Sequence, residues 1–163
     1  EIACDDTVDL YTLATDAVER LSNVAEKKGI SLRIHGEGVM ITANAESIEE
    51  MIYNLVDNGI KYNKNGGFVE VTVGADFGDA VLSVKDNGIG IPQDKHDRVF
   101  ERFYRVDKSH SKEIGGTGLG LSIVKHAAMR HGAKISLTSE IDVGTEITVR
   151  FPISKQDEMH SKS

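Results

Sequence analysis

The chain has 163 residues, of which 39% are hydrophobic and 28% are charged, so it can bury the core of one domain. Its 19 basic and 26 acidic residues give a net charge of −7, which argues against a general binder of nucleic acid or of membrane surfaces. The single cysteine, Cys4, excludes an internal disulfide framework and a metal site made of several cysteines. The sequence has no apolar run of the roughly 18 residues that a membrane span needs, and no signal-peptide pattern. Because it begins at Glu1, we expect a piece of a longer protein.

Hydrophobic periodicity predicts the elements in chain order. Residues 1–8 form a short edge strand, and a helix begins at about Asp9, its N-cap, and stops at Gly29. Further helices are predicted over about 45–62 and 119–131. Alternating polar and apolar residues predict strands at 30–34, 39–43, 68–75, 80–85, 133–139 and 145–151. Residues 35–38 read as a turn, with 39–43 as its return strand.

This order predicts an α+β fold. Strand pairs joined by short turns favour a mixed, mostly antiparallel sheet, and three amphipathic helices would cover one face of it as a two-layer α/β sandwich. Residues 86–120 are polar and rich in glycine, and only 99–106 look helical. A stretch of this length without regular structure is expected to be functional, for example a lid.

One polar stripe lies on the helix predicted over 45–62. Its members are three or four residues apart and so share one helix face: Glu50, Asn54, Asn58 and Lys61. Amide oxygens are hard ligands suited to Mg²⁺, and together with an ammonium group they could hold a metal–phosphate group. A plain solvated helix face fits the same spacing. The Asn58-Gly59 pair also resembles a hairpin turn, but the apolar stripe continues through it, so we expect a helix.

Two glycine-containing segments could bind a ligand: one follows a predicted strand, and the other opens a predicted helix. The first is Asp86-Asn87-Gly88-Ile89-Gly90-Ile91-Pro92, where a carboxylate at a strand end can accept a hydrogen bond from an exocyclic amine such as that of adenine. An ordinary glycine turn is the alternative. The second is Gly115-Gly116-Thr117-Gly118-Leu119-Gly120-Leu121-Ser122, which leads into an apolar helix whose free N–H groups favour phosphate. Neither the P-loop nor the dinucleotide-binding fingerprint fits the sequence.

Four segments resemble, in order and spacing, the boxes of the ATP-binding catalytic domain of bacterial sensor histidine kinases. They are Asn54–Tyr62 for the N box, Asp86-x-Gly88-x-Gly90 for the G1 box, Phe100–Arg105 for the F box and Gly116–Leu121 for the G2 box. The resemblance spans about residues 5–153. We take residues 1–153 as the ATP-binding catalytic domain and 154–163 as a polar tail. It implies the Bergerat-type sandwich that gyrase, heat-shock chaperone and mismatch-repair ATPases share.

The resemblance also implies ATP and Mg²⁺ as cofactors and a role for each matching residue. Asn58 would be the principal Mg²⁺ ligand, assisted by Asn54, and Lys61 would contact phosphate. Tyr62 would pack on adenine, and Asp86 would accept the adenine amino hydrogen bond. The adenine pocket would be shaped by Gly88, Gly90 and Ile91. The phosphates would be cradled by Gly116, Thr117, Gly118, Leu119 and Gly120, and approached by Arg102 and Arg105 from a mobile lid over about 93–115.

One difference from the wider fold bears on the reaction. Hydrolysing relatives and related serine kinases resemble one another in placing Glu where Asn54 stands, and an amide cannot take a proton as that Glu does. We therefore expect a protein-histidine kinase domain that hydrolyses ATP poorly. The alternatives are a stand-alone serine kinase of the anti-sigma type and a non-catalytic, nucleotide-gated interaction module. Against the family pattern, Gly59 replaces the usual alanine, and Asn63 replaces Ser or Thr.

The chain lacks a phosphoacceptor motif. Among its 6 histidines only His96 precedes an acid, Asp97, and no proline follows it, so His96, His110 and His126 are read as surface or lid residues. The partners implied are a dimerisation domain of the same protein, which carries the acceptor histidine, and a response regulator, but no nucleic acid. We expect the isolated domain to be a monomer, the full-length kinase to be a homodimer, and the domain to be the cytoplasmic part of a membrane-anchored bacterial sensor kinase.

Overall fold

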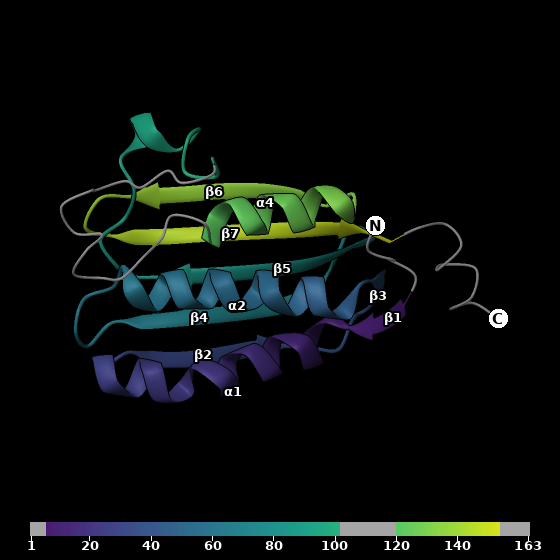
Figure 1. Ribbon diagram of the computed structural model, residues 1–163, viewed down its shortest axis with the longest axis horizontal. Coiled ribbons are helices and arrows are strands. Elements are labelled where there is room, and N and C mark those ends of the chain that lie inside the picture. The colour runs from purple at the N-terminus through teal and green to yellow at the C-terminus, as the bar shows by residue number, and fades with distance from the viewer. Residues whose placement is uncertain (1–5, 102–119, 154–163) are drawn as a thin grey trace.

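The computed structural model describes residues 6–101 and 120–153, which form a two-layer α+β sandwich (Figure 1). One layer is a five-stranded sheet. In order across the sheet the strands are β2 (Ser31–Gly36), β4 (Phe68–Asp76), β5 (Asp79–Asp86), β7 (Gly144–Pro152) and β6 (Lys134–Glu140). The other layer is made of the helices α1 (Leu10–Lys28), α2 (Ala45–Lys61) and α4 (Gly120–Arg130). Among the strand pairs of the described residues, only β2–β4 is parallel, so the predicted mixed, mostly antiparallel sheet under three helices is confirmed.

The strand after β2 pairs differently from the prediction. β3 (Met40–Ala43) lies antiparallel to β1 (Asp6–Asp9) in a separate two-stranded sheet, whereas β2 pairs with β4. The expectation that residues 39–43 return along 30–34 is therefore wrong. The amide of Val39 donates to the Asp9 carboxylate at 3.2 Å, and the amide of Leu10 donates to the Val39 carbonyl at 2.9 Å. These bonds direct the chain toward β1 and away from β2.

Helix ends follow the predicted capping residues. The Asp9 carboxylate accepts hydrogen bonds from the Tyr11 amide at 3.0 Å and the Thr12 hydroxyl at 3.1 Å, as an N-cap does. Gly29 ends α1 with a φ of 74°, a left-handed conformation that glycine adopts readily. Helix α2 continues through Gly59, so the helical interpretation of the Asn58-Gly59 pair is confirmed.

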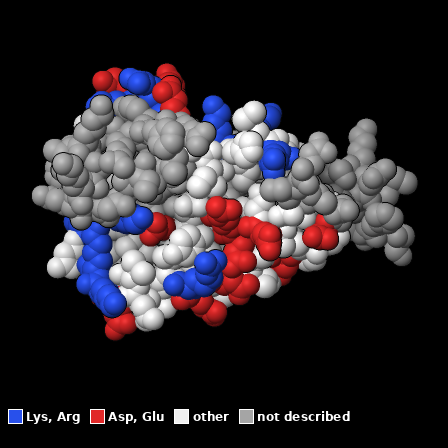
Figure 2. Space-filling view, viewed as in Figure 1, with Lys and Arg blue, Asp and Glu red and all other residues white. Residues whose placement is uncertain are grey.

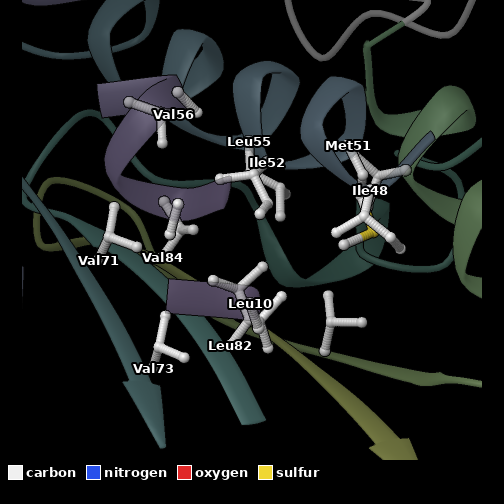
Figure 3. Packing of buried hydrophobic residues seen from close by; sticks show 14 of the residues in the cluster. Leu10, Ile48, Met51, Ile52, Leu55, Val56, Val71, Val73, Leu82 and Val84 are labelled. Atoms are coloured by element: carbon white, nitrogen blue, oxygen red, sulfur yellow. The ribbon is translucent and has the colours of Figure 1, made fainter. Parts of the chain in front are cut away.

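The core lies between the two layers. Leu10, Ile48 and Ile52 of the helices pack toward Val71 and Leu82 of the sheet (Figure 3), and all five side chains are buried. Helix α2 lies between α1 and α4 (Figure 1) and contributes the buried stripe to this core. Its polar stripe is thereby left beside α4.

His131 connects the end of α4 to the start of α2. Its Nδ1 lies 2.7 Å from the Ala127 carbonyl oxygen, and its Nε2 lies 3.1 Å from the amide nitrogen of Asn44, the N-cap of α2. Because the Asn44 N–H is a donor, Nε2 is the acceptor and Nδ1 carries the hydrogen. The imidazole thus bridges the two helices.

Replacing His131 with alanine should lower the free energy of unfolding by about 1–2 kcal/mol, because the Asn44 amide loses its acceptor. Urea denaturation of the chain measures this loss. His126, exposed on α4, gives the matched control variant His126→Ala. An equal loss in both variants would contradict the bridge.

Candidate functional site

The amides of the polar stripe face the first turn of α4. Asn54 and Asn58 are both half-buried, and Asn54 Nδ2 donates to the Glu50 carbonyl at 2.9 Å. A methyl group added to Gly120 would lie 3.0 Å from Asn58 Nδ2 and 3.6 Å from Asn54 Oδ1. The fold therefore brings Asn54, Asn58 and Gly120 together, as the sequence predicts. It also places two amide oxygens beside a helix N-terminus, which attracts phosphate.

Lys61 lies one turn beyond Asn58 and is held by its own helix. Its Nζ forms an ion pair with Asp57 Oδ2 at 2.9 Å, in the i, i+4 arrangement. The pair is only partly exposed, so the ammonium group has a defined position at the end of α2. Glu50, at the other end of the stripe, is exposed.

Asp86 ends β5 at the centre of the sheet and is half-buried. Its Oδ1 accepts a hydrogen bond from the Gly88 amide at 2.9 Å, and the backbone of Thr145 donates a second one. Burial raises the pKa of Asp86 to about 6, although both hydrogen bonds act to lower it. Such a carboxylate in a partly dry setting is a strong, directed acceptor for an amine.

The loop after Asp86 is shaped by two glycines. A side chain at Gly88 would collide with the Tyr62 carbonyl oxygen, and one at Gly90 would collide with the Glu140 carbonyl oxygen. Gly90 also has a φ of 75°, which disfavours any other residue. Both predicted pocket glycines are thus required by close backbone approach.

Ile91 follows these glycines and is fixed on both sides. Its amide donates to the Ser139 hydroxyl at 2.8 Å, and His96 Nε2 lies 2.9 Å from its carbonyl oxygen. His96, which sequence reasoning left as a surface or lid residue, therefore supports the loop.

Backbone contacts join the end of α2 to this loop. The Ile89 amide donates to the Tyr62 carbonyl at 3.0 Å, so the half-buried Tyr62 sits directly against the loop that follows Asp86. Two asparagines reinforce the connection, since Asn63 Nδ2 donates to the Phe68 carbonyl at 2.9 Å and the Phe68 amide donates to Asn87 Oδ1 at 2.7 Å. We call Asn63 and Asn87, with their bonds to the Phe68 backbone, the Asn63–Asn87 clamp. The sequence assigns no role to it, although Asn63 departs from the family pattern and Asn87 lies between Asp86 and Gly88 of the G1 box.

Gly59 lets α2 approach the sheet beneath Asp86. A methyl group at this position would lie 3.0 and 3.1 Å from the two methyls of Val69 and 3.6 Å from Asp86 Cβ. Gly59, which departs from the family pattern, thus occupies a close contact of α2 with the sheet.

A groove of about 1010 Å³ opens beside the stripe. It lies between the start of α2, residues 100–101 and α4, and its lining includes the apolar side chains of Phe100, Ile123 and Met129. Glu50 lines it, whereas Asn58 and Asp86 do not. The groove is therefore a neighbour of the stripe and does not contain it.

The donor set of the stripe fits Mg²⁺. Among residues 6–101 and 120–153, no group of three or more His, Cys, Asp or Glu residues is placed to hold a metal ion. Mg²⁺ does not need such a cage, because it keeps several waters and takes phosphate oxygens alongside one or two protein oxygens. The oxygens of Asn58 and Asn54 meet that requirement.

Part of the prediction falls outside the described residues. This applies to Arg102, Arg105, Gly116, Thr117, Gly118 and Leu119, to the lid beyond residue 101, and to the tail at 154–163. Within the described part of the lid, η1 (Gln93–Lys95) is a short 3₁₀ turn. Residues 99–100, predicted to open a helix, lie in a turn instead.

Comparison with known proteins agrees with this geometry. The family described as "Histidine kinase-, DNA gyrase B-, and HSP90-like ATPase" matches residues 43–155. The chain is 40% identical over 165 residues to the sensor-like histidine kinase SenX3 of Mycolicibacterium smegmatis, covering 96% of this chain and 41% of that protein. It is 39% identical over 145 residues to the sensor histidine kinase YkoH of Bacillus subtilis, covering 89% of this chain and 31% of that protein. The chain thus spans less than half the length of these relatives.

Solved structures show the same likeness. The mycobacterial sensor histidine kinase MprB superposes with a TM-score of 0.79 at 27% identity, covering 91% of this chain and 97% of that one. Full-length ShkA in complex with AMPPNP superposes with a TM-score of 0.79 at 26% identity, covering 94% of this chain and 32% of that one. The predicted resemblance to histidine kinase catalytic domains is confirmed.

Proposed function

Because the chain belongs to the histidine kinase-, DNA gyrase B-, and HSP90-like ATPase family, we propose that it binds Mg²⁺-ATP and donates the γ-phosphate to a histidine on a separate domain. One observation carries the proposal. The amides of Asn54 and Asn58 meet the start of α4, and the Tyr62–Ile89 hydrogen bond joins the end of the same helix to the loop that follows the half-buried Asp86. A phosphate-binding end and an adenine-binding end are thus connected in one site.

Each described residue has a distinct task in this proposal. Asp86 accepts a hydrogen bond from the adenine amino group, and Tyr62 packs on the ring. Asn58 and Asn54 hold Mg²⁺, which offsets the negative charge of the phosphates when bound. Lys61 exchanges part of its contact with Asp57 for phosphate. The N-terminus of α4 at Gly120 binds phosphate oxygens through the N–H groups of its first turn.

The amide at position 54 favours transfer to histidine over hydrolysis. Asn54 has no basic atom that could take a proton from water or from a serine hydroxyl. A histidine nucleophile attacks with its own nitrogen lone pair and has less need of such a base. The relatives reported above are sensor histidine kinases, which does not favour the serine-kinase alternative.

The proposed reaction needs two partners outside this chain. The acceptor histidine lies on a dimerisation domain of the same protein, and the phosphoryl group passes on to a response regulator. The apolar groove lined by Phe100, Ile123 and Met129 offers that domain a surface beside the phosphate end. No helix in the part of the chain that the structure describes is long and apolar enough to cross a membrane. We further propose that the parent kinase is anchored in a membrane and is a homodimer at full length. In this proposal the present domain lies in the cytoplasm.

Calorimetric titration of the chain with ATP, with and without Mg²⁺, tests the nucleotide site. We expect a Kd in the micromolar to sub-millimolar range, with tighter binding when Mg²⁺ is present. GTP is the matched control, because guanine presents a carbonyl where adenine presents its amine, and it should bind more weakly. Absence of ATP binding in both conditions would refute the proposal.

A further inference from the structure

We propose that Lys28, the last residue of α1, is a positioning residue for nucleotide binding, because its ammonium group fixes the turn of α2 that carries Lys61 and Tyr62. The inference rests on the proposed function, in which these two residues contact the nucleotide. Lys28 itself has no place in the boxes that the sequence predicts.

The contacts of Lys28 are made to main-chain oxygens of another helix. Its Nζ donates to the Ile60 carbonyl at 2.7 Å and to the Lys61 carbonyl at 2.5 Å. Carbonyls in the last turn of a helix form the negative end of its dipole. That of Ile60 also accepts the Asn63 amide at 3.3 Å. A cation that bridges two of them holds the end of α2 in place.

The burial of Lys28 distinguishes it from its neighbour. Lys28 is half-buried, and this burial lowers the pKa of its ammonium group. Lys27, one residue earlier, is exposed. The two lysines are therefore adjacent at the end of α1 but differ in how far they are buried.

The surrounding chain supports the same junction. Gly29 accepts a hydrogen bond from the Gly66 amide at 3.0 Å, and Ser31 donates one to the Gly67 carbonyl at 2.9 Å. These bonds fix the loop after α2, whereas Lys28 fixes the helix end itself. Helices α1 and α2 terminate at the same end of the molecule in Figure 1, and Figure 2 shows Lys and Arg side chains gathered at that edge.

The residues beside the Ile60 and Lys61 carbonyls connect Lys28 to the proposed nucleotide site. Lys61 extends from the second bonded residue toward Asp57, and the next carbonyl, that of Tyr62, accepts the Ile89 amide. Without the bridge, the last turn of α2 is free to fray, and both proposed nucleotide contacts lose their defined position. Asn54 and Asn58 lie earlier in the helix and keep theirs.

Calorimetry with the Lys28→Met variant tests the proposal, since methionine keeps an aliphatic stem and removes the donors. We expect the Kd for ATP to rise about threefold to tenfold, both with and without Mg²⁺. The ratio of the two Kd values should stay unchanged, because the metal ligands are untouched, whereas a general loosening of the domain would alter it. Lys28→Arg should restore the wild-type Kd to within about twofold, since guanidinium can donate to both carbonyls.

The matched control is Lys27→Met, measured with the other variants at a temperature where denaturation curves show each of them folded. Wild-type affinity in Lys28→Met, or an equal loss in Lys27→Met, would overturn the positioning role. If Lys28→Met does not fold, Lys28→Leu, whose side chain also has no donor, provides the same comparison. Failure of the wild-type chain to bind ATP would instead refute the proposed function, so the two failures are distinguishable.

Discussion

Replacing Asp86 with asparagine is expected to weaken ATP binding while making the nucleotide-free fold more stable. At pH 7.5 the variant should lose about 1–3 kcal/mol of ATP binding free energy, because the adenine amine loses a charged acceptor. The side chain keeps nearly the same size, and its oxygen can still accept the Gly88 amide. Calorimetry with ATP at pH 7.5 measures the loss, and an unchanged Kd would contradict the role of Asp86.

The effect on stability follows from the pKa of the same carboxyl group. Burial raises the pKa of Asp86 from 3.8 to about 6, so the folded chain binds this proton more tightly than the unfolded chain. The stabilisation is fully present below pH 3.8 and is lost as the pH rises through 6. At pH 7.5 the free energy of unfolding of the variant should therefore exceed that of the wild type by about 1–3 kcal/mol. Loss of the hydrogen bond from Thr145 reduces this gain.

Denaturation in urea at pH 4.5 and pH 7.5, without nucleotide, checks this sign. The advantage of Asp86→Asn should be largest at pH 7.5 and shrink toward pH 4.5. The wild-type chain should also bind ATP more weakly below pH 6, where Asp86 takes up a proton. A variant that is less stable than the wild type at pH 7.5 would mean that the carboxylate supports the fold.

The second large effect is expected for Asn58→Ala, which should abolish the Mg²⁺-dependent tightening of ATP binding. Alanine removes the amide oxygen that we propose as the principal ligand, and Asn54, which we propose only as an assisting ligand, does not replace it. Paired titrations with and without Mg²⁺ measure the ratio of Kd values, which should approach one. Asn23, exposed on α1, supplies the control Asn23→Ala. If Mg²⁺ still tightens binding to the Asn58 variant equally, the metal is held elsewhere.

Local sequence predicted the elements of this fold better than their pairing. The apolar stripe of α2 runs through Asn58-Gly59, and the structure is helical there. The pairing of β3 was missed because the turn at 35–38 is compatible with a hairpin. The hydrogen bond that directs β3 toward β1 joins Asp9 to Val39, which are thirty residues apart. A local sequence pattern cannot indicate a contact over that separation.

The same limit applies to the site. Asp86, Gly88 and Gly90 can be proposed from the sequence, because a carboxylate at the end of a predicted strand and closely spaced glycines form a recognisable pattern. Lys28 and the Asn63–Asn87 clamp act through backbone carbonyls and amides of distant residues. Such bonds depend on the fold and show no periodicity or spacing in the sequence.

The order of the strands also determines when the sheet is completed during synthesis. β7 is the last of these strands to leave the ribosome, yet it lies between β5 and β6. Until residues 144–152 emerge, β5 keeps an unpaired edge and β6 has no strand to join. The closing step joins segments separated by residues 87–143, which makes it a slow, non-local event. The nascent chain is therefore most open to misassembly at the strand that ends in Asp86.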